Sequence, residues 1–231
     1  MVQSGALGKI MRFTGTYDQD QLLDESLPIT WRHINKLAGC GALGDLGSHL
    51  LSISQFIMGD ITKVNAVATT VFPKRPKSAG STEMVDVENE DIMTFMAEYA
   101  NGAIGQIACS RVATGRKNYL TYEIQGTKGS VRYDLERMGE VQVYFQSDNE
   151  RDRGFRTVLL NPLMKGYSAF QPAGGISIAY NDMKILEVHA LFDAITNGAD
   201  YVTDFEFGYK IDRTVAAVIE SSKTREWVDV K

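Results

Sequence analysis

The sequence has little cysteine, no excess of positive charge and no long apolar runs. Cys40 and Cys109 lie far apart without CxxC spacing, which argues against a disulfide framework and favours a reducing compartment, the cytoplasm. Lys and Arg number 24 against 29 Asp and Glu, and this net charge of −5 argues against a nucleic-acid partner. No apolar run approaches the ~20 residues of a membrane span. The opening residues MVQSG form no secretion signal, so we expect neither membrane insertion nor export.

The overall composition is that of an ordinary globular protein. Of the 231 residues, 44% are hydrophobic and 23% are charged, which excludes disordered and collagen-like chains. A chain of this length can bury a substantial core, either in one large domain or in two small ones.

The middle of the chain is rich in strand-forming runs. These runs occupy residues 61–72, 90–99, 103–112, 119–126, 130–135, 141–145 and 155–160, and a further strand is predicted over residues 10–17. Asn101-Gly102 is a typical two-residue hairpin turn. Connections this short cannot hold parallel crossovers, so we predict a largely antiparallel sheet. Residues 73–80, rich in Pro, Lys and Ser, are predicted to form a surface loop.

Apolar residues at helical spacing predict three helices. The first covers residues 45–58, the second carries a stripe from Ile185 to Ile195, and the third follows a capping box at Thr203–Glu206. We expect all three apolar stripes to lie in the core. One large, mostly antiparallel sheet with helices on one face is the simplest α+β architecture for this order of elements.

The segment Gly39–Gly44 matches G-x-G-x-x-G, but its surroundings argue against a dinucleotide-binding loop. That fingerprint needs a preceding strand, a following helix and an acidic residue at the end of a second strand. Residues 32–38 are polar and show no strand pattern, and Asp60 directly follows a helix-ending glycine. We therefore interpret the segment as a flexible turn that lets the backbone approach a ligand or a neighbouring domain.

Asp45 and His49 are the candidate catalytic residues. Their i,i+4 spacing places both on one helix face, beside Gly41, Gly44 and Gly47, whose missing side chains leave room for a substrate or cofactor ring. A neighbouring Asp can orient the imidazole and raise its pKa, which suits proton transfer near neutrality. Two alternatives are a capping Asp with a core His, and a metal-dependent hydrolase. No further pair of metal-ligating residues has matching spacing.

The Asp45/His49 pair belongs to a larger set of motifs that runs along the chain. These are Gly8-Lys9-Ile10, Tyr17-Asp18-Gln19-Asp20, Trp31-Arg32, Gly41 to His49, Gly59-Asp60-Ile61, Val64-Asn65-Ala66, Asn101 to Gly105, Gln125 to Ser130 and Asp204-Phe205-Glu206. In combination they closely resemble the Gfo/Idh/MocA family, whose members are NAD(P)-dependent sugar and inositol oxidoreductases.

The resemblance implies that residues 1–231 form a single C-terminal domain for substrate binding and oligomerisation, with a glyceraldehyde-3-phosphate-dehydrogenase-like fold. The family's N-terminal Rossmann domain, which mainly binds NAD or NADP, is missing from this sequence, as is the Glu-Lys-Pro motif with its catalytic lysine. We therefore expect the isolated chain to be inactive. Cofactor-binding residues within the chain stay unassigned, and no metal ligand is assigned.

The resemblance also implies roles for five residues. His49 would be the general base that removes the proton of a substrate hydroxyl, which becomes a ketone as hydride leaves the same carbon for the nicotinamide. Asp45 would hold that hydroxyl or fix His49. Gln19 and Arg32 match positions that face the sugar or polyol substrate, and their side chains suit several hydroxyls. Trp31 is either a stacking surface for a sugar face or a half-buried structural residue.

The partners implied are a small sugar or polyol and further copies of the chain. An antiparallel sheet with helices on one side leaves an open face, through which we expect a homo-oligomer to form. The rival hypothesis is a non-catalytic carbohydrate-binding or assembly module without a cofactor domain. Arg111, Arg116 and Tyr180 are interpreted as solvated or structural, because no motif supports a role for them.

Overall fold

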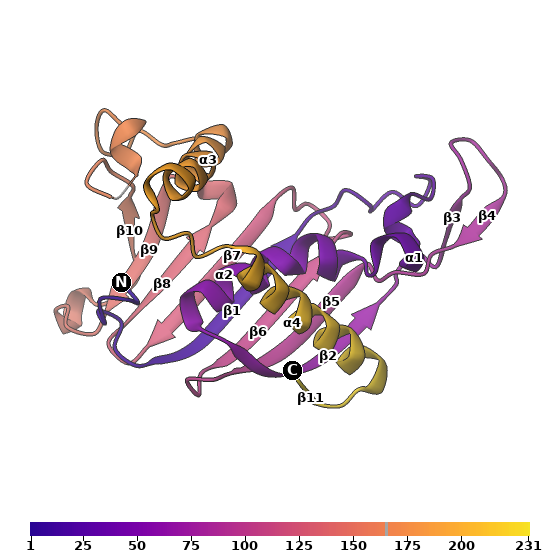
Figure 1. The fold of residues 1–231 in the computed structure, drawn as a ribbon, viewed down its shortest axis with the longest axis horizontal. Helices are drawn as coiled ribbons and strands as arrows, with labels where there is room; N and C mark the ends of the chain where they lie inside the picture. The colour runs from indigo at the N-terminus through magenta and orange to yellow at the C-terminus, as the bar shows by residue number, and fades with distance from the viewer. Residues whose placement is uncertain (165) are drawn as a thin grey trace.

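A nine-stranded sheet, covered by helices on one face, dominates the computed structural model, which describes residues 1–164 and 166–231 (Figure 1). Its strands are β1 (Ile10–Asp18), β2 (Ile61–Thr69), β5 (Ile92–Tyr99), β6 (Ile104–Ser110), β7 (Tyr119–Gly126), β8 (Gly129–Asp134), β9 (Glu140–Phe145), β10 (Arg156–Leu159) and β11 (Val228–Asp229). Their order is β10-β9-β8-β7-β1-β6-β5-β2-β11. β1 pairs with β6 in parallel and with β7 antiparallel. The predicted α+β fold with a mostly antiparallel sheet is confirmed.

A short hairpin replaces part of the predicted surface loop. β3 (Lys74–Pro76) pairs with β4 (Met84–Asp86) and projects from the end of the molecule. The fully buried Arg75 anchors its base by donating to the carbonyl of Asp24 at 2.8 Å and to that of Leu22 at 2.5 Å. The polar composition of residues 73–80 hides this pairing, because it depends on contacts with a distant segment.

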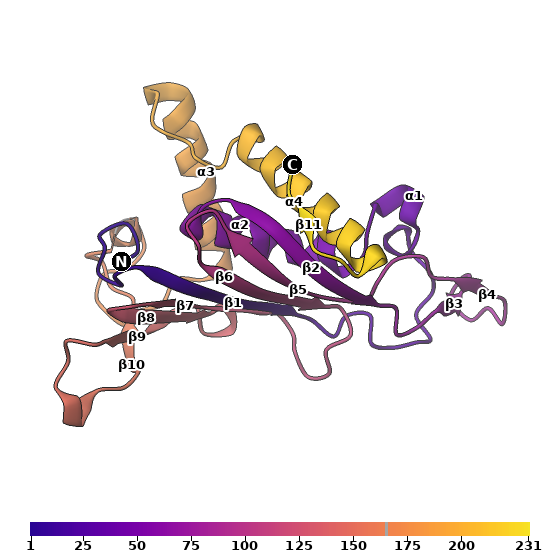
Figure 2. The same cartoon turned by 90° about the horizontal axis from the view of Figure 1, so that it is seen from below.

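Two helices cover the sheet. These two helices are α2 (Ser48–Met58) and α4 (Phe205–Thr224). The described residues also form α1 (Asn35–Ala38) and α3 (Tyr180–Asn197). α2 and α4 lie on the same side of the sheet (Figure 2) and are joined by a 3.1 Å hydrogen bond from Gln55 to Thr214. Ser221 of α4 accepts a 2.9 Å hydrogen bond from the Ala66 backbone of β2. None of the described helices combines the length and apolarity needed to cross a membrane.

Strand alternation separates a covered face of the sheet from an uncovered one. Met93, Phe95 and Ala97 of β5 are buried under the helices, as period-two alternation requires. The residues between them in the sequence point to the opposite face of the sheet. The central strands β2, β5, β6 and β1, which pair in this order, form this face. We call this the uncovered face; it includes Arg12, Val67, Met96, Ile104 and Gln106.

The apolar stripe of α3 does not lie in the core. None of the residues of α3 is buried, and Phe192 and Ile195 are 60% and 69% exposed. The expectation of a buried stripe is wrong for this helix, although it holds for α4, whose Ile211 and Val218 are buried. In Figure 2, α3 projects away from the sheet. Its apolar residues accordingly stay exposed.

Candidate active site

The helix predicted over residues 45–58 begins with a π turn. Leu43–Gly47 is π-helical, and the backbone N–H of Ser48 donates to the carbonyl of Leu43 before α2 continues as a regular helix. Asp45 lies in the π turn and His49 in the first turn of α2. Such turns are rare and frequently lie at functional sites. Apolar spacing could not predict this turn, because a single wide turn leaves the pattern of buried leucines nearly unchanged.

The segment Gly39–Gly44 is fixed in place by Glu90. The Glu90 carboxylate accepts hydrogen bonds from the N–H groups of Gly41 and Leu43, both at 2.9 Å. A Cβ on Gly41 would meet the Glu90 carbonyl oxygen at 2.0 Å, which explains the glycine. The structure thus corrects the interpretation of a flexible turn. Because the segment follows α1 and its N–H groups bind a carboxylate, it does not fit a dinucleotide phosphate.

Asp45 is held by two arginines. The guanidinium of Arg111 pairs with Oδ2 of Asp45, and Nε of Arg32 lies 3.3 Å from the same oxygen. The Arg111 side chain is only 8% exposed, whereas that of Arg32 is 42% exposed. Among the described residues, Oδ1 of Asp45 has no hydrogen-bond partner. Because Oδ2 takes both ion pairs, Oδ1 can accept a hydrogen bond from a ligand hydroxyl.

His49 is not paired with Asp45. Its ring nitrogens make no hydrogen bond to a described residue, and the ring of Tyr17 stands edge-on to it at a centroid distance of 5.8 Å. Burial and the positive charge of Lys184 hold the pKa of His49 below its ordinary value of 6.5. The expected rise of this pKa is therefore wrong, because burial and Lys184 both lower it and His49 is not paired with Asp45. At neutral pH the imidazole is neutral and able to accept a proton.

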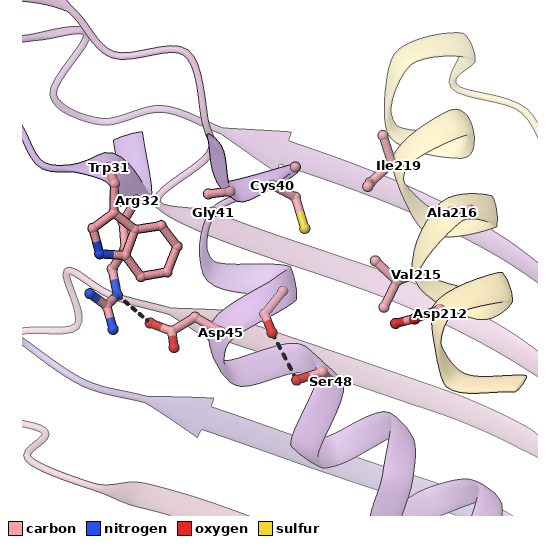
Figure 3. Close-up of a pocket in the computed structure, with 13 residues that line it drawn as sticks. Trp31, Arg32, Cys40, Gly41, Asp45, Ser48, Asp212, Val215, Ala216 and Ile219 are labelled. Carbon is pink, nitrogen blue, oxygen red and sulfur yellow. Dashed lines mark hydrogen bonds and ion pairs between the residues drawn. The ribbon is translucent and has the colours of Figure 1, made fainter. Parts of the chain in front are cut away.

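Two adjoining hollows open beside these residues. The Asp45 hollow, about 460 Å³, lies between Trp31 and Arg32 on one side and α4 on the other (Figure 3). The His49 hollow, about 560 Å³, lies between α2 and residues 203–212. Ser48 and Asp212 line both hollows. Each volume lies within the about 300–1,000 Å³ typical of small-molecule sites.

The wall of the Asp45 hollow combines an aromatic surface with polar groups. Trp31 is 53% exposed, and the Arg32 guanidinium carbon lies 4.5 Å from the centre of its ring. Burial raises the pKa of the Cys40 thiol to about 11, so this thiol is protonated at neutral pH.

No group of three or more metal-ligating side chains occurs among the described residues.

Gln19 and Arg111 lie behind the Asp45 hollow. Gln19 is 7% exposed, and its amide oxygen accepts a 2.6 Å hydrogen bond from Arg111. Its amide nitrogen donates to Asn118 at 2.9 Å and to the Tyr17 hydroxyl at 3.3 Å. All polar atoms of the Gln19 side chain bind protein groups, and its predicted contact with a substrate stays a prediction. Sequence reasoning missed Arg111, since no local spacing connects it with Asp45.

The geometry agrees with comparisons to known proteins. A model described as the GFO/IDH/MocA C-terminal domain matches residues 1–132, more than half of the chain. The chain belongs to the Gfo/Idh/MocA family. Levoglucosan dehydrogenase of Pseudarthrobacter phenanthrenivorans is 38% identical to this chain. The match covers 99% of this chain and 62% of the dehydrogenase. D-apiose dehydrogenase of Rhizobium rhizogenes is 30% identical over 41% of this chain and 26% of its own length.

Solved structures of family members share the whole fold. Levoglucosan dehydrogenase in complex with NADH and L-sorbose superposes with a TM-score of 0.95 at 38% identity, over 100% of this chain and 61% of that one. An NAD binding oxidoreductase from Klebsiella pneumoniae gives a TM-score of 0.95 at 39% identity, with the same coverage. This Gfo/Idh/MocA chain therefore spans less than two thirds of the length of these relatives.

Proposed function

We propose that this chain is the substrate-side domain of an NAD(P)-dependent oxidoreductase that converts a hydroxyl of a sugar, inositol or related polyol to a ketone. The observation that carries the proposal is a carboxylate fixed by two guanidinium groups, next along the helix to an unprotonated imidazole, with adjoining hollows at both. The relatives' complexes with NADH, levoglucosan and L-sorbose support this chemistry.

His49 accepts the proton of the hydroxyl that is oxidised. Oxidation of an alcohol removes this proton together with a hydride from the same carbon, so the base must lie within hydrogen-bond reach of the hydroxyl oxygen. A neutral His49 with free ring nitrogens meets this requirement. Asp45 accepts a hydrogen bond from a neighbouring hydroxyl through Oδ1 and so orients the ring.

Trp31 and Arg32 hold the body of the substrate. The half-exposed indole of Trp31 offers an apolar face for the C–H side of a sugar ring. Arg32 uses Nε for Asp45, which leaves the outer N–H groups of its guanidinium for hydroxyl oxygens of the ligand. Both side chains line the Asp45 hollow in Figure 3.

The hydride acceptor, a nicotinamide nucleotide, is held outside this chain, because Gly39–Gly44 does not fit a dinucleotide. The domain that carries it packs on a docking face formed by exposed apolar residues of α3 and of the start of α4, where Phe205 and Tyr209 line the His49 hollow. These residues are Val188, Phe192, Ile195, Phe205 and Tyr209. Their exposed fractions, 99% for Phe205 and 65% for Tyr209, are typical of a surface that a partner covers. The chain alone is therefore inactive.

The uncovered face of the sheet joins copies of the chain. Ile104 is 58% exposed there, and Val67 and Met96 are each 50% exposed. A shallow groove of about 400 Å³ runs between them. An apolar sheet face next to charged Arg12 can meet its own copy across a two-fold axis, as self-complementary interfaces require.

The test uses the protein expressed from the whole open reading frame that contains this chain. Reduction of NAD⁺ or NADP⁺ is followed with levoglucosan, L-sorbose, inositols and common aldoses. Turnover of at least one of these compounds supports the proposal, and the isolated chain should bind the same compound without turnover. Binding without turnover in both proteins would contradict it and favour a non-catalytic carbohydrate-binding module.

A further inference from the structure

A buried polar network connects the surroundings of Asp45 with those of His49. Arg111 pairs with Asp45 and donates to Gln19 at 2.6 Å. Gln19 donates to the hydroxyl of Tyr17 at 3.3 Å, and the ring of Tyr17 stands edge-on to His49. Asp45 and His49 do not contact each other, so this network is the physical connection between them.

We propose that Arg111 is a positioning residue that fixes the Asp45 carboxylate with Oδ1 toward the substrate, and that Gln19 and Tyr17 hold Arg111 in that position. The inference rests on the proposed function, because it assigns Asp45 to a substrate hydroxyl. It gives Gln19 a supporting role behind the site in place of direct contact with the sugar.

The guanidinium geometry carries the argument. Nη2 of Arg111 faces Asp45, whereas Nη1 donates to Gln19 at 2.6 Å and to Gln21 at 3.1 Å. Its backbone is fixed as well, since its N–H donates to the Asp91 carbonyl at 2.9 Å. A planar guanidinium group that is bonded through both Nη atoms cannot rotate. It therefore determines which carboxylate oxygen of Asp45 stays free.

The network is anchored on its outer side by the loop after β6. Asn118 accepts hydrogen bonds from the Tyr17 hydroxyl at 2.7 Å and from Gln19 at 2.9 Å. The Asn118 backbone N–H in turn donates to Glu136 at 3.0 Å. A buried and fully bonded network of this kind rigidifies the groups that it holds. Its free end is the Asp45 carboxylate, which is the part exposed to a ligand.

Sugar discrimination tests the inference better than overall affinity does. The isolated chain is titrated by calorimetry with levoglucosan and with its three singly deoxygenated analogues. In the wild type, the analogue that lacks the hydroxyl facing Asp45 should bind about 10-fold or more weakly, and Asp45→Ala identifies that hydroxyl by abolishing the difference. Arg111→Met should abolish the same difference, because the carboxylate is no longer fixed.

Two further variants separate positioning from general stability. Arg116→Met removes an exposed guanidinium that stacks on Tyr119 at 3.6 Å, outside the network, and should keep the wild-type discrimination. Gln19→Leu keeps the Arg111–Asp45 pair but removes an acceptor of Arg111, and it should lose part of the discrimination. It reports on the network even where Arg111→Met does not fold.

The outcomes are distinguishable. Equal weakening of all four sugars by Arg111→Met, with the preference intact, would overturn the positioning role and leave the proposed function standing. Absence of any sugar binding by the wild-type chain would overturn the proposed function and this inference together. Loss of preference in Arg111→Met and Gln19→Leu, but not in Arg116→Met, supports the inference.

Discussion

His49 and Asp45 are close in sequence but lie in different electrostatic surroundings. Asp45 is surrounded by Arg32 and Arg111, whereas Lys184 is the only charged group that shifts the pKa of His49. Burial and a positive charge both favour the neutral imidazole. The two residues can therefore divide the chemistry, with the carboxylate orienting the substrate and the imidazole accepting a proton.

The pH dependence of turnover tests this division at His49. The imidazole must be neutral to accept a proton, so activity is present above its pKa in the folded protein and is lost as the pH falls through that value. Because this pKa lies below 6.5, the acid limb of kcat/KM should lie below pH 6.5. Lys184→Gln removes a charge that lowers the pKa, so the limb should move to higher pH.

The control for this experiment is Lys128→Gln, which removes an exposed lysine from the β7–β8 turn. Its acid limb should coincide with that of the wild type in a profile of kcat/KM against pH. An acid limb of Lys184→Gln that stays in place or moves to lower pH would contradict the assignment.

Sequence spacing predicted Asp45 and His49 as a pair on one helical segment, but not the groups that surround them in the fold. Both residues lie on one short helical segment, where i,i+4 spacing implies proximity. Arg111 comes from a loop after β6, and only the tertiary fold brings it to Asp45. The same limit applies to Gln19, whose burial could not be deduced from its neighbours in the sequence.

Among the structural elements, the π turn and the glycine segment before it depend most on close packing. Gly41→Ala would place a Cβ 2.0 Å from the Glu90 carbonyl oxygen, and we expect a loss of about 1–3 kcal/mol in the free energy of unfolding. Urea denaturation followed by circular dichroism measures it.

Gly208→Ala is the matched control, because a Cβ at this position of α4 meets nothing within 4 Å. It should stabilise the chain by about 0.5–1 kcal/mol through better helix propensity. Equal stability of Gly41→Ala and wild type would show that the contact with Glu90 is not required.

The apolar pattern of α3 predicted a helix but not its partner. A stripe at helical spacing predicts that a helix has an apolar side, but it does not identify what covers that side. In this chain no described element covers α3, whereas α4 packs on β2. The strands were easier to predict, since turn residues such as Asn101-Gly102 mark their ends directly.

The docking face can be tested with Phe192→Ser. Since Phe192 is 60% exposed, the substitution should change the stability of the isolated chain by less than about 0.5 kcal/mol. In the protein from the whole reading frame it should lower the midpoint of thermal unfolding and the turnover, because a buried aromatic contact between domains is lost. Calorimetry of both proteins compares the two effects, and an equal effect in both would contradict a domain contact there.

For the whole molecule, we propose that the uncovered face of the sheet joins copies of the chain. Ile104→Lys places a charge in the centre of this face and should weaken self-association by about 10-fold or more. Sedimentation equilibrium measures the molar mass over a range of concentrations. Phe56→Lys, at a residue that is 51% exposed on α2, is the control and should keep the wild-type mass. A monomeric wild type would contradict the predicted interface.

We propose that His49 is the base of a sugar oxidation that is completed by a nicotinamide nucleotide held outside this chain. The most direct measurement compares the initial rate of nicotinamide reduction by the wild type, His49→Ala and His189→Ala, all expressed from the whole reading frame with the best substrate found. We predict a loss of about 100- to 10,000-fold in His49→Ala and an unchanged rate in His189→Ala, whose imidazole is exposed on α3. Equal rates in all three proteins would contradict the account.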